Sequence, residues 1–361
     1  MNFIYFLVEL NHYKKGRAMM PSFTEELEQR DWLLADGAIG TNLFEMGLSN
    51  GDAPEIWNET EPQKIKKLHR MFGDAGSELF LTNSFGANRA RLKLHKLEKK
   101  SYKLSRISAA LAKEVASEFK NKIFVAGSIG PTGEILSPIG DLKFDIAVEF
   151  FHEQAEGLKA GGADIIWVET ISAAEEFYAA AKAIELVGLP WCGTMSFDTA
   201  GRTMMGISPQ EFVKIIKDLE NPPTAFGANC GTGAADIIKT LQGFTKEDFD
   251  IPLILKGNAG VPRFENGEFL YDGTPEVMAQ YALLARDSGA KIIGGCCGTA
   301  YEHIGAMKLA LETTPLGNPP SDDLIVSKLG KFSKNLNETI GKNTDRASSS
   351  RSRRKRRSTS L

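Results

Sequence analysis

The sequence predicts an α/β fold in which eight strand–helix units close into a barrel. Short apolar runs alternate with amphipathic stretches along the chain, and these pairs number eight. Each short run is apolar throughout, which is typical of parallel strands that helices bury on both faces. The 361 residues suffice for one barrel of roughly 250 residues with insertions and tails. We therefore expect a single-domain TIM-type (β/α)8 barrel. A doubly wound open sheet is less favoured, because no Gly-x-Gly-x-x-Gly follows the first strand.

The strands and helices are expected in strict alternation. The strands are 32–36, 79–85, 123–128, 164–169, 191–197, 225–229, 253–257 and 291–295. The helices are 62–75, 99–119, 144–160, 172–187, 208–220, 234–243, 274–288 and 300–312. Ser172 with Glu175, and Ser208 with Glu211, have the spacing of a capping box at a helix start. Gly188 supplies a residue suited to a left-handed helix end.

Composition and charge are those of a globular protein that acts on small molecules. Apolar residues make up 42% and charged residues 25% of the chain, as in ordinary globular domains. The formal net charge is −3, although seven Arg and Lys residues lie within 346–361. The barrel itself is therefore acidic, which argues against nucleic-acid binding outside this basic tail. No feature of the sequence indicates an oligomeric state.

Both ends of the chain are expected to lie outside the barrel, which we assign to residues 21–314. Residues 1–20 are expected to form a loose extension, with Met19 or Met20 as an alternative start. Their apolar run lacks the basic flank and the cleavage site of a secretory signal and is too short for a membrane span. Residues 315–361 are polar and basic and are expected to be a disordered tail. Four cysteines without a repeated spacing predict a reducing, cytoplasmic location.

Three cysteines follow two of the expected strands. Cys230 lies in GANCG after the sixth strand, and Cys296 and Cys297 lie in GGCCG after the eighth. In a parallel barrel these strand ends meet on one rim, where active sites lie. Three thiolates suit Zn²⁺ and leave a fourth position open for a substrate. The cysteines alone also leave a buried, purely structural role open, and Cys192, inside an apolar strand, is expected to be core.

With its other motifs, the chain resembles the homocysteine S-methyltransferase family. The motifs are DGAIGT at 36–41, LTNSF at 81–85, GSIGPTG at 127–133, VET at 168–170, GANCG at 227–231, KGNAGVP at 256–262 and GGCCGT at 294–299. They appear in the family's order between about residues 30 and 312. The family includes betaine–homocysteine methyltransferase and the homocysteine module of cobalamin-dependent methionine synthase.

The resemblance implies a zinc site and a homocysteine site. Cys230, Cys296 and Cys297 are expected to hold Zn²⁺, with the homocysteine thiolate as fourth ligand. Asp36 and Glu169 are expected to bind the ammonium group of homocysteine. Gly37, with the N–H of Ala38, and Thr82 are expected to bind its carboxylate. Without the zinc site, the simpler interpretation is that Asp36 caps a helix or turn and that Glu169 forms an ion pair at the rim of the barrel.

The methyl donor is expected to be an onium compound, most of all glycine betaine, which gives methionine and dimethylglycine. An onium donor leaves as a neutral molecule, whereas a folate donor needs a cobalt relay and domains for which the chain has no room. S-methylmethionine, or a separate methyl-corrinoid or folate partner, is the alternative. Trp57, Phe85 and Phe197 are candidates for an aromatic cage around the onium group. Gly86 and Thr170 stand where the animal betaine enzymes carry tyrosines, so that cage is not reproduced.

Two readings from other classes remain open at this point. A barrel with a closed structural zinc site would be a binding protein without catalytic activity. A lyase or aldolase would need a strand-end lysine, for which Lys256 is positioned.

Overall fold

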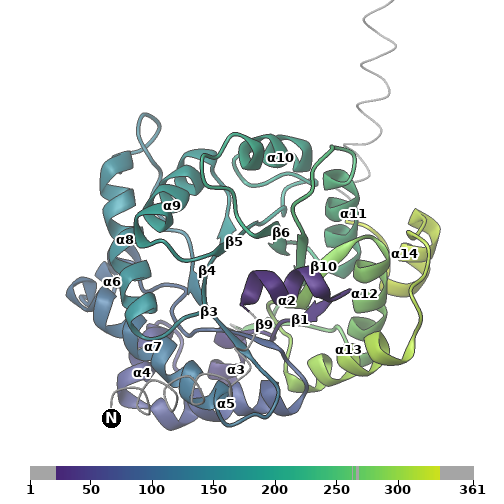
Figure 1. Ribbon diagram of the computed structural model, residues 1–361, viewed down its shortest axis with the longest axis horizontal. Coiled ribbons are helices and arrows are strands. Elements are labelled where there is room, and N and C mark those ends of the chain that lie inside the picture. Colours follow the sequence, from purple (N-terminus) through teal and green to yellow (C-terminus); the bar gives the residue numbers. More distant parts are fainter. Residues whose placement is uncertain (1–21, 262, 266–267, 334–361) are drawn as a thin grey trace, which may run out of the picture.

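Eight parallel strands form a nearly closed barrel, which confirms the predicted fold class (Figure 1). The computed structural model describes residues 22–261, 263–265 and 268–333. The barrel strands are β1 (Leu33–Leu34), β2 (Leu79–Leu81), β3 (Phe124–Ile129), β4 (Ile165–Ile171), β5 (Trp191–Met195), β6 (Ala225–Cys230), β7 (Leu253–Gly257) and β10 (Ala290–Gly295). All eight lie where the sequence predicts them. The expected extension 1–20 and the basic residues near the C-terminus lie outside the described residues.

Each barrel strand pairs in parallel with its neighbours in the chain order, and β10 pairs with β1. A bridge between Ala35 and Leu79 joins β1 to β2. There the N–H of Asp36 donates to the carbonyl of Leu79 at 3.0 Å. This single bridge nearly closes the barrel, and the carboxyl ends of all its strands face the same side.

Helices alternate with the strands and cover the outside of the barrel (Figure 1). They are α5 (Pro62–Asp74), α7 (Ser101–Ala116), α8 (Phe144–Ala160), α9 (Ala174–Val187), α10 (Pro209–Lys217), α11 (Ala234–Phe244), α12 (Pro275–Asp287) and α13 (Tyr301–Thr313). The capping box of Ser208 and Glu211 is confirmed at the start of α10. The one expected at Ser172 is wrong, because the Ser172 carbonyl accepts from Thr203 and the helix begins after Ala173.

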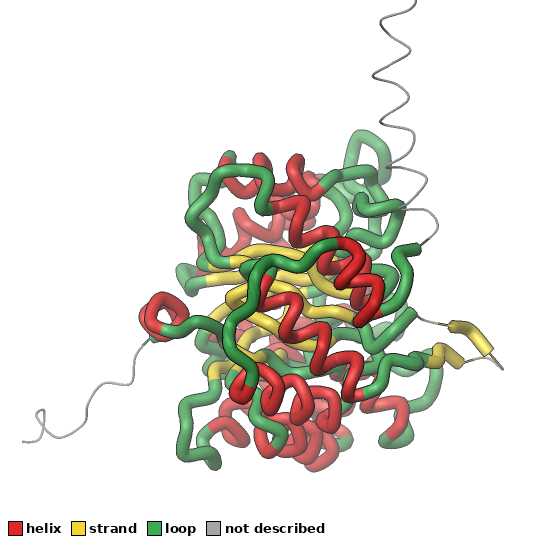
Figure 2. The backbone as a smooth tube through the Cα atoms, turned by 90° about the vertical axis from the view of Figure 1, so that its right-hand side faces the viewer, coloured by secondary structure: helices red, strands yellow, loops and turns green. Residues whose placement is uncertain are grey.

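Shorter elements that the sequence analysis did not predict complete the fold. They are α2 (Phe23–Gln29), α3 (Ile39–Glu45), η1 (Pro54–Ile56), α4 (Trp57–Thr60), α6 (Arg89–Lys93), η2 (Glu98–Lys100), β8 (Arg263–Glu265), β9 (Glu268–Leu270) and α14 (Asp322–Leu329). Phe23 and Leu27 of α2 pack with Trp167 and Cys192 inside the barrel. This helix closes one end of the barrel, while the β8–β9 hairpin projects from the opposite end (Figure 2). The core role expected for Cys192 is confirmed, since this side chain is fully buried.

The chain beyond residue 314 begins with packed structure, which corrects the expectation that a disordered tail starts there. Ser321 caps α14, and Ile325 is fully buried against the barrel helices. Lys239 of α11 forms an ion pair with Asp322 at 2.6 Å. These contacts explain the difference, because a short apolar stripe within a polar segment is enough to dock one helix. Within the described residues, no helix has the length and apolar character that crossing a bilayer requires.

Candidate metal centre and active site

The structure brings three cysteines together at the carboxyl end of the barrel. Cys230 ends β6, and Cys296 and Cys297 follow β10, two strands away. The register of the strands explains why the cysteines lie close together. Cys230 of β6 and Gly295 of β10 both pair with Gly257 of β7, the strand between them. The three sulfur atoms lie within 4.8 Å of one another.

The spacing of these sulfurs fits a tetrahedral metal site. Zn–S bonds of about 2.3 Å place two sulfurs of a tetrahedron about 3.8 Å apart. The Sγ atoms of Cys230 and Cys297 are 4.0 Å apart. The cluster therefore needs little adjustment to hold a metal ion with three thiolates.

The backbone around the cysteines is fixed by local geometry. Cys230 adopts a φ of 63°, a left-handed conformation that is uncommon outside glycine and turns the chain out of β6. The N–H of Cys296 donates to the Gly257 carbonyl at 2.7 Å, and the carbonyl of Cys297 accepts from Ala259 at 2.9 Å. Both hydrogen bonds tie the cysteine loop to the end of β7, so the thiols are held before any ligand binds.

The electrostatics of the cluster favour a cation. Hydrogen bonding with Cys230 raises the pKa of Cys296 above its ordinary value, Cys297 offsets part of this rise, and burial adds to it. Closely packed thiols thus resist ionisation on their own, whereas a divalent cation deprotonates a coordinating thiol. Asn229 donates to the Cys296 sulfur at 3.7 Å and is itself held by Thr194 at 2.7 Å and by Thr170. Asn229 therefore fixes the position of the Cys296 thiol.

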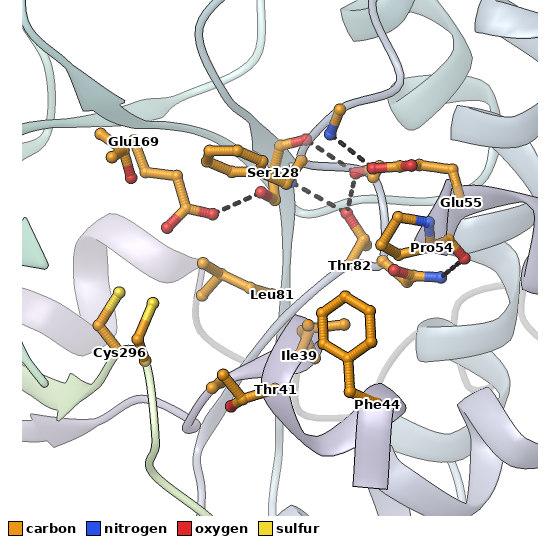
Figure 3. Close-up of a pocket in the computed structure, with 18 of the residues that line it drawn as sticks. Ile39, Thr41, Phe44, Pro54, Glu55, Leu81, Thr82, Ser128, Glu169 and Cys296 are labelled. Carbon is orange, nitrogen blue, oxygen red and sulfur yellow. Dashed lines mark hydrogen bonds between the residues drawn. The ribbon is translucent and has the colours of Figure 1, made fainter. Parts of the chain in front are cut away.

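A cavity of about 520 Å³ opens beside the cysteines (Figure 3). Among the predicted site residues, Gly37, Thr82, Phe85, Glu169 and the three clustered cysteines line it. In Figure 3, Cys296 and Glu169 lie on one side of the cavity, and Phe44 and Glu55 lie on the other. The cysteine cluster is therefore open to a space that can hold a ligand and is not enclosed by protein on all sides.

Glu169 presents a carboxylate to this cavity from the end of β4. Its side chain is 8% exposed and accepts a hydrogen bond from the Ser128 hydroxyl at 2.5 Å. Burial raises the pKa of Glu169, while Lys256 and Ser128 act in the opposite direction. The arrangement can bind a cationic group next to the cysteines.

Asp36 lies behind the cavity wall, which differs from the direct substrate contact expected from the sequence. Its Oδ1 accepts from the Lys256 ammonium at 2.8 Å, and its Oδ2 accepts from the Leu81 N–H at 2.8 Å. Both side chains of this ion pair are almost fully buried. Burial raises the pKa of Asp36, and the Lys256 charge offsets part of this rise. Lys256 is thus held as an ion-pair partner, which does not support a lyase or aldolase that uses this lysine as its nucleophile.

Gly37 and Thr82 both line the cavity, and the contacts that each residue makes with the protein limit how it can bind a ligand. A Cβ atom at Gly37 would lie 2.6 Å from the Thr299 carbonyl oxygen, so only glycine fits there. The Thr82 hydroxyl accepts from the Ser128 N–H at 2.9 Å and shares a hydrogen bond with Ser84. The N–H of Ala38 donates to Thr299 and is therefore not free for a carboxylate, contrary to expectation.

Of the aromatic candidates for the donor, only Phe85 lines the cavity. Trp57 is 8% exposed and packs under the Lys64 ammonium. Phe197 is buried against Phe212 and Phe244. The expectation is corrected for Trp57 and Phe197, because both rings are part of the core and not of the cavity wall.

Several residues at the site were missed as binding or positioning groups. Ser128 holds Glu169, Lys256 pairs with Asp36, and the Tyr271 ring packs against Gly298 in the cysteine loop. Ser128 lies in GSIGPTG and Lys256 in KGNAGVP, so their motifs were visible although the roles were not. Tyr271 follows the unpredicted hairpin and gave no signal of this kind.

Comparison with known proteins agrees with this geometry. Residues 33–311 match the family model described as homocysteine S-methyltransferase. Methionine synthase of Mycobacterium leprae is 30% identical over 82% of this chain, and that of Mycobacterium tuberculosis is 30% identical over 75%. The matches cover 26% and 24% of these relatives, so the chain spans about a quarter of their length.

Solved structures of one protein share the fold. The Escherichia coli homocysteine methyltransferase MmuM in its oxidized form has a TM-score of 0.64 and 25% identity, covering 78% of this chain and 97% of that one. Its metallated form gives a TM-score of 0.67 at 23% identity, with the same coverage. With the family match extending over the whole barrel and the cysteine motifs inside it, the chain belongs to the homocysteine S-methyltransferase family.

Proposed function

We propose that this protein is a zinc-dependent methyltransferase that transfers a methyl group from glycine betaine to homocysteine. The observation that carries the proposal is the cluster of three cysteine sulfurs, within 4.8 Å of one another, that opens into a cavity shared with Glu169. Cys230, Cys296 and Cys297 would hold the ion. Zinc bound there would keep the homocysteine thiol deprotonated and nucleophilic at neutral pH.

The buried charges beside the cysteines suit the amino-acid part of homocysteine. With both carboxylates ionised, Asp36, Glu169 and Lys256 would carry one negative charge in excess, because Lys256 pairs with Asp36. The ammonium group of homocysteine would restore neutrality next to Glu169. Asp36 acts on this balance through Lys256, while Gly37 lines the cavity and allows the close approach of the Thr299 carbonyl.

The remaining part of the cavity is suited to a small onium donor. Its wall includes the aromatic rings of Phe44 and Phe85 and the carboxylates of Asp52 and Glu55. Aromatic faces and carboxylates both attract a quaternary ammonium or a sulfonium group. A volume of about 520 Å³ leaves room for a second molecule of amino-acid size beside homocysteine.

We further propose a cytoplasmic location, because all four cysteines are free thiols, as expected in a reducing compartment. The substrates are small molecules, and the barrel that binds them extends from α2 through α14.

The test is an assay of methionine formed by zinc-loaded protein and homocysteine, with betaine, S-methylmethionine and methyl-folate offered separately. Betaine is expected to give methionine and dimethylglycine in equal amounts. Turnover with only S-methylmethionine, or only with an added methyl-corrinoid protein, would replace the donor and keep the homocysteine site. Binding of homocysteine is also expected to release a proton and change the metal–sulfur ligation. A closed structural zinc site would show neither change, and that result would overturn the enzymatic proposal.

A further inference from the structure

A buried carboxylate lies in the cavity on the side away from the three cysteines. Glu55 of η1 is 4% exposed and lines the cavity. Its Oε1 accepts a hydrogen bond from the Gly86 N–H at 2.6 Å. Among the residues that the structure describes, no lysine, arginine or histidine forms an ion pair with it. The proposed homocysteine site makes no use of this group.

The surrounding backbone holds Glu55 in this position. A Cβ atom at Gly86 would lie 2.9 Å from Oε1 of Glu55, so a larger residue there would push the carboxylate away. The Asn83 amide donates to the Pro54 carbonyl at 2.8 Å, and Asn58 donates to the Asn83 carbonyl at 2.8 Å. These bonds fasten η1 to the loop after β2. The position of the carboxylate is thus set by two elements far apart in the sequence.

An isolated buried carboxylate is costly unless a cation or several hydrogen-bond donors meet it. Burial raises the pKa of Glu55, and hydrogen bonding to the backbone lowers it in part. Arg91 of α6 and His95, just after this helix, line the same cavity, and their positive potential also favours the ionised form. A cationic ligand in the cavity would supply the missing counter-charge directly.

We propose that Glu55 binds the onium group of the methyl donor and makes the site selective for a positively charged donor. This inference rests on the proposed function and names the residue that recognises the charge of the donor. In the reaction, the homocysteine sulfur forms a bond to the methyl carbon as the bond from carbon to the onium atom breaks. The electron pair of the broken bond stays on the departing nitrogen or sulfur, which leaves neutral.

The loss of the onium charge decides how Glu55 affects the kinetics. The carboxylate attracts the donor most strongly before transfer, because the positive charge is already dispersing in the transition state. Interactions that are stronger in the ground state lower KM without raising kcat. Removing the Glu55 charge is therefore expected to raise KM for the donor while kcat stays the same or increases.

The experiment compares charged donors with neutral molecules of the same shape. Tert-butylacetate replaces the nitrogen of betaine by carbon, and homoleucine does the same for the sulfur of S-methylmethionine. Dissociation constants are measured by calorimetry on the zinc- and homocysteine-loaded protein, together with KM and kcat for each donor. Comparing the two pairs shows whether the site prefers an ammonium donor or a sulfonium donor. The variants are Glu55→Gln, Glu55→Asp and, as a matched control, Glu59→Gln, whose carboxylate pairs with Lys100 at 2.6 Å outside the cavity.

The wild type is expected to prefer the onium compound of one pair over its carbon analogue. Glu55→Gln is expected to lose about 30-fold or more of this preference, as when one partner of a buried charge pair is truncated. Glu55→Asp keeps a charge and is expected to retain part of the preference, and Glu59→Gln is expected to match the wild type. Equal weakening of both members of a pair in Glu55→Gln would show a purely structural role and overturn the inference.

Failure of this inference differs from failure of the proposed function. A wild type that makes methionine from betaine, with an unchanged preference in Glu55→Gln, refutes the role of Glu55 alone. If Glu55→Gln fails to fold, Glu55→Asp decides, because an unaltered fold with no preference left for the onium compound contradicts a charge-based role. A wild type that forms no methionine from any donor, and binds neither onium compound, refutes the proposed function and this inference with it.

Discussion

The buried ion pair between Asp36 and Lys256 makes a quantitative prediction about the Lys256→Met variant. Both side chains are almost fully buried, with 2.8 Å between the ammonium and the carboxylate. Methionine retains most of the aliphatic stem beside Trp167 but removes the ammonium, so Asp36 keeps the Leu81 N–H as a donor and loses its counter-charge. Breaking a buried pair from one side costs about 3–5 kcal/mol, because an uncompensated charge stays behind. We expect the free energy of unfolding to fall by that amount at pH 7.

The Asp36→Asn/Lys256→Met double variant is the control for this reasoning. Asparagine keeps an acceptor for the Leu81 N–H and removes the charge. The free energy of unfolding of the double variant is therefore expected to exceed that of Lys256→Met by about 2 kcal/mol or more. The measurement is urea unfolding followed by far-ultraviolet circular dichroism. The predicted cost of the unpaired charge is refuted if the free energy of unfolding of Lys256→Met lies within about 1 kcal/mol of the wild-type value, or if the double variant is as unstable as Lys256→Met.

The pH dependence of the Lys256→Met variant has a defined sign. Burial without the lysine raises the pKa of Asp36 in the folded state. The folded variant then takes up a proton before the unfolded chain does, whose aspartate pKa is about 3.9. A raised carboxyl pKa stabilises the fold at low pH, and this contribution is lost as pH rises through the folded pKa. The stability deficit relative to wild type is therefore expected to shrink as pH falls toward 4.

Three further predictions concern the proposed zinc ligand Cys297, the stability of the fold at low pH, and Gly37 in the cavity wall. Cys297→Ala is expected to lose stoichiometric zinc and activity together, whereas Cys192→Ala keeps both; retained zinc in the former would contradict the ligand assignment. Burial lowers the pKa of His69 to about 4, so the fold loses stability as pH falls from about 6.5 to 4. His69→Phe is expected to remove this loss, worth about 3 kcal/mol, in unfolding curves at several pH values. Gly37→Ala places a Cβ 2.6 Å from the Thr299 carbonyl and is expected to raise KM for homocysteine, with metal content unchanged.

The fold could be predicted because its signal is local and repeated. Strand β7 and helix α8 lie at the predicted bounds, since apolar runs and helical periodicity are visible in single segments. Short elements carry too little periodicity, and α2 and α3 have only seven residues each. Ser22 with Glu25 forms a capping box at α2, a signal that the sequence analysis did not use.

The candidate site was only partly predictable, because its contacts join distant segments. The strand-end position of Cys230 and Cys296 followed from the barrel, and the structure brings them together. The pairing of Asp36 with Lys256 joins residues 220 positions apart and depends on the side-chain directions at two strand ends. Trp57 and Phe197 were misplaced because the 4-residue helix α4 and the segment after β5 are too short for a periodicity that tells a cavity wall from the core.

The positions of the two ends of the cavity restrict how a donor can react. Methyl transfer to sulfur is an in-line displacement, so the leaving atom must lie on the far side of the methyl carbon from the attacking thiolate. Cys296 lies on one side of the cavity, and Glu55 lies on the other (Figure 3). A donor whose onium atom is held near Glu55 therefore points a methyl group back toward the cysteines. Because the unreacted donor carries the full positive charge, the proposed contact with Glu55 is expected to strengthen donor binding, and a carbon analogue that lacks the charge is expected to lose affinity.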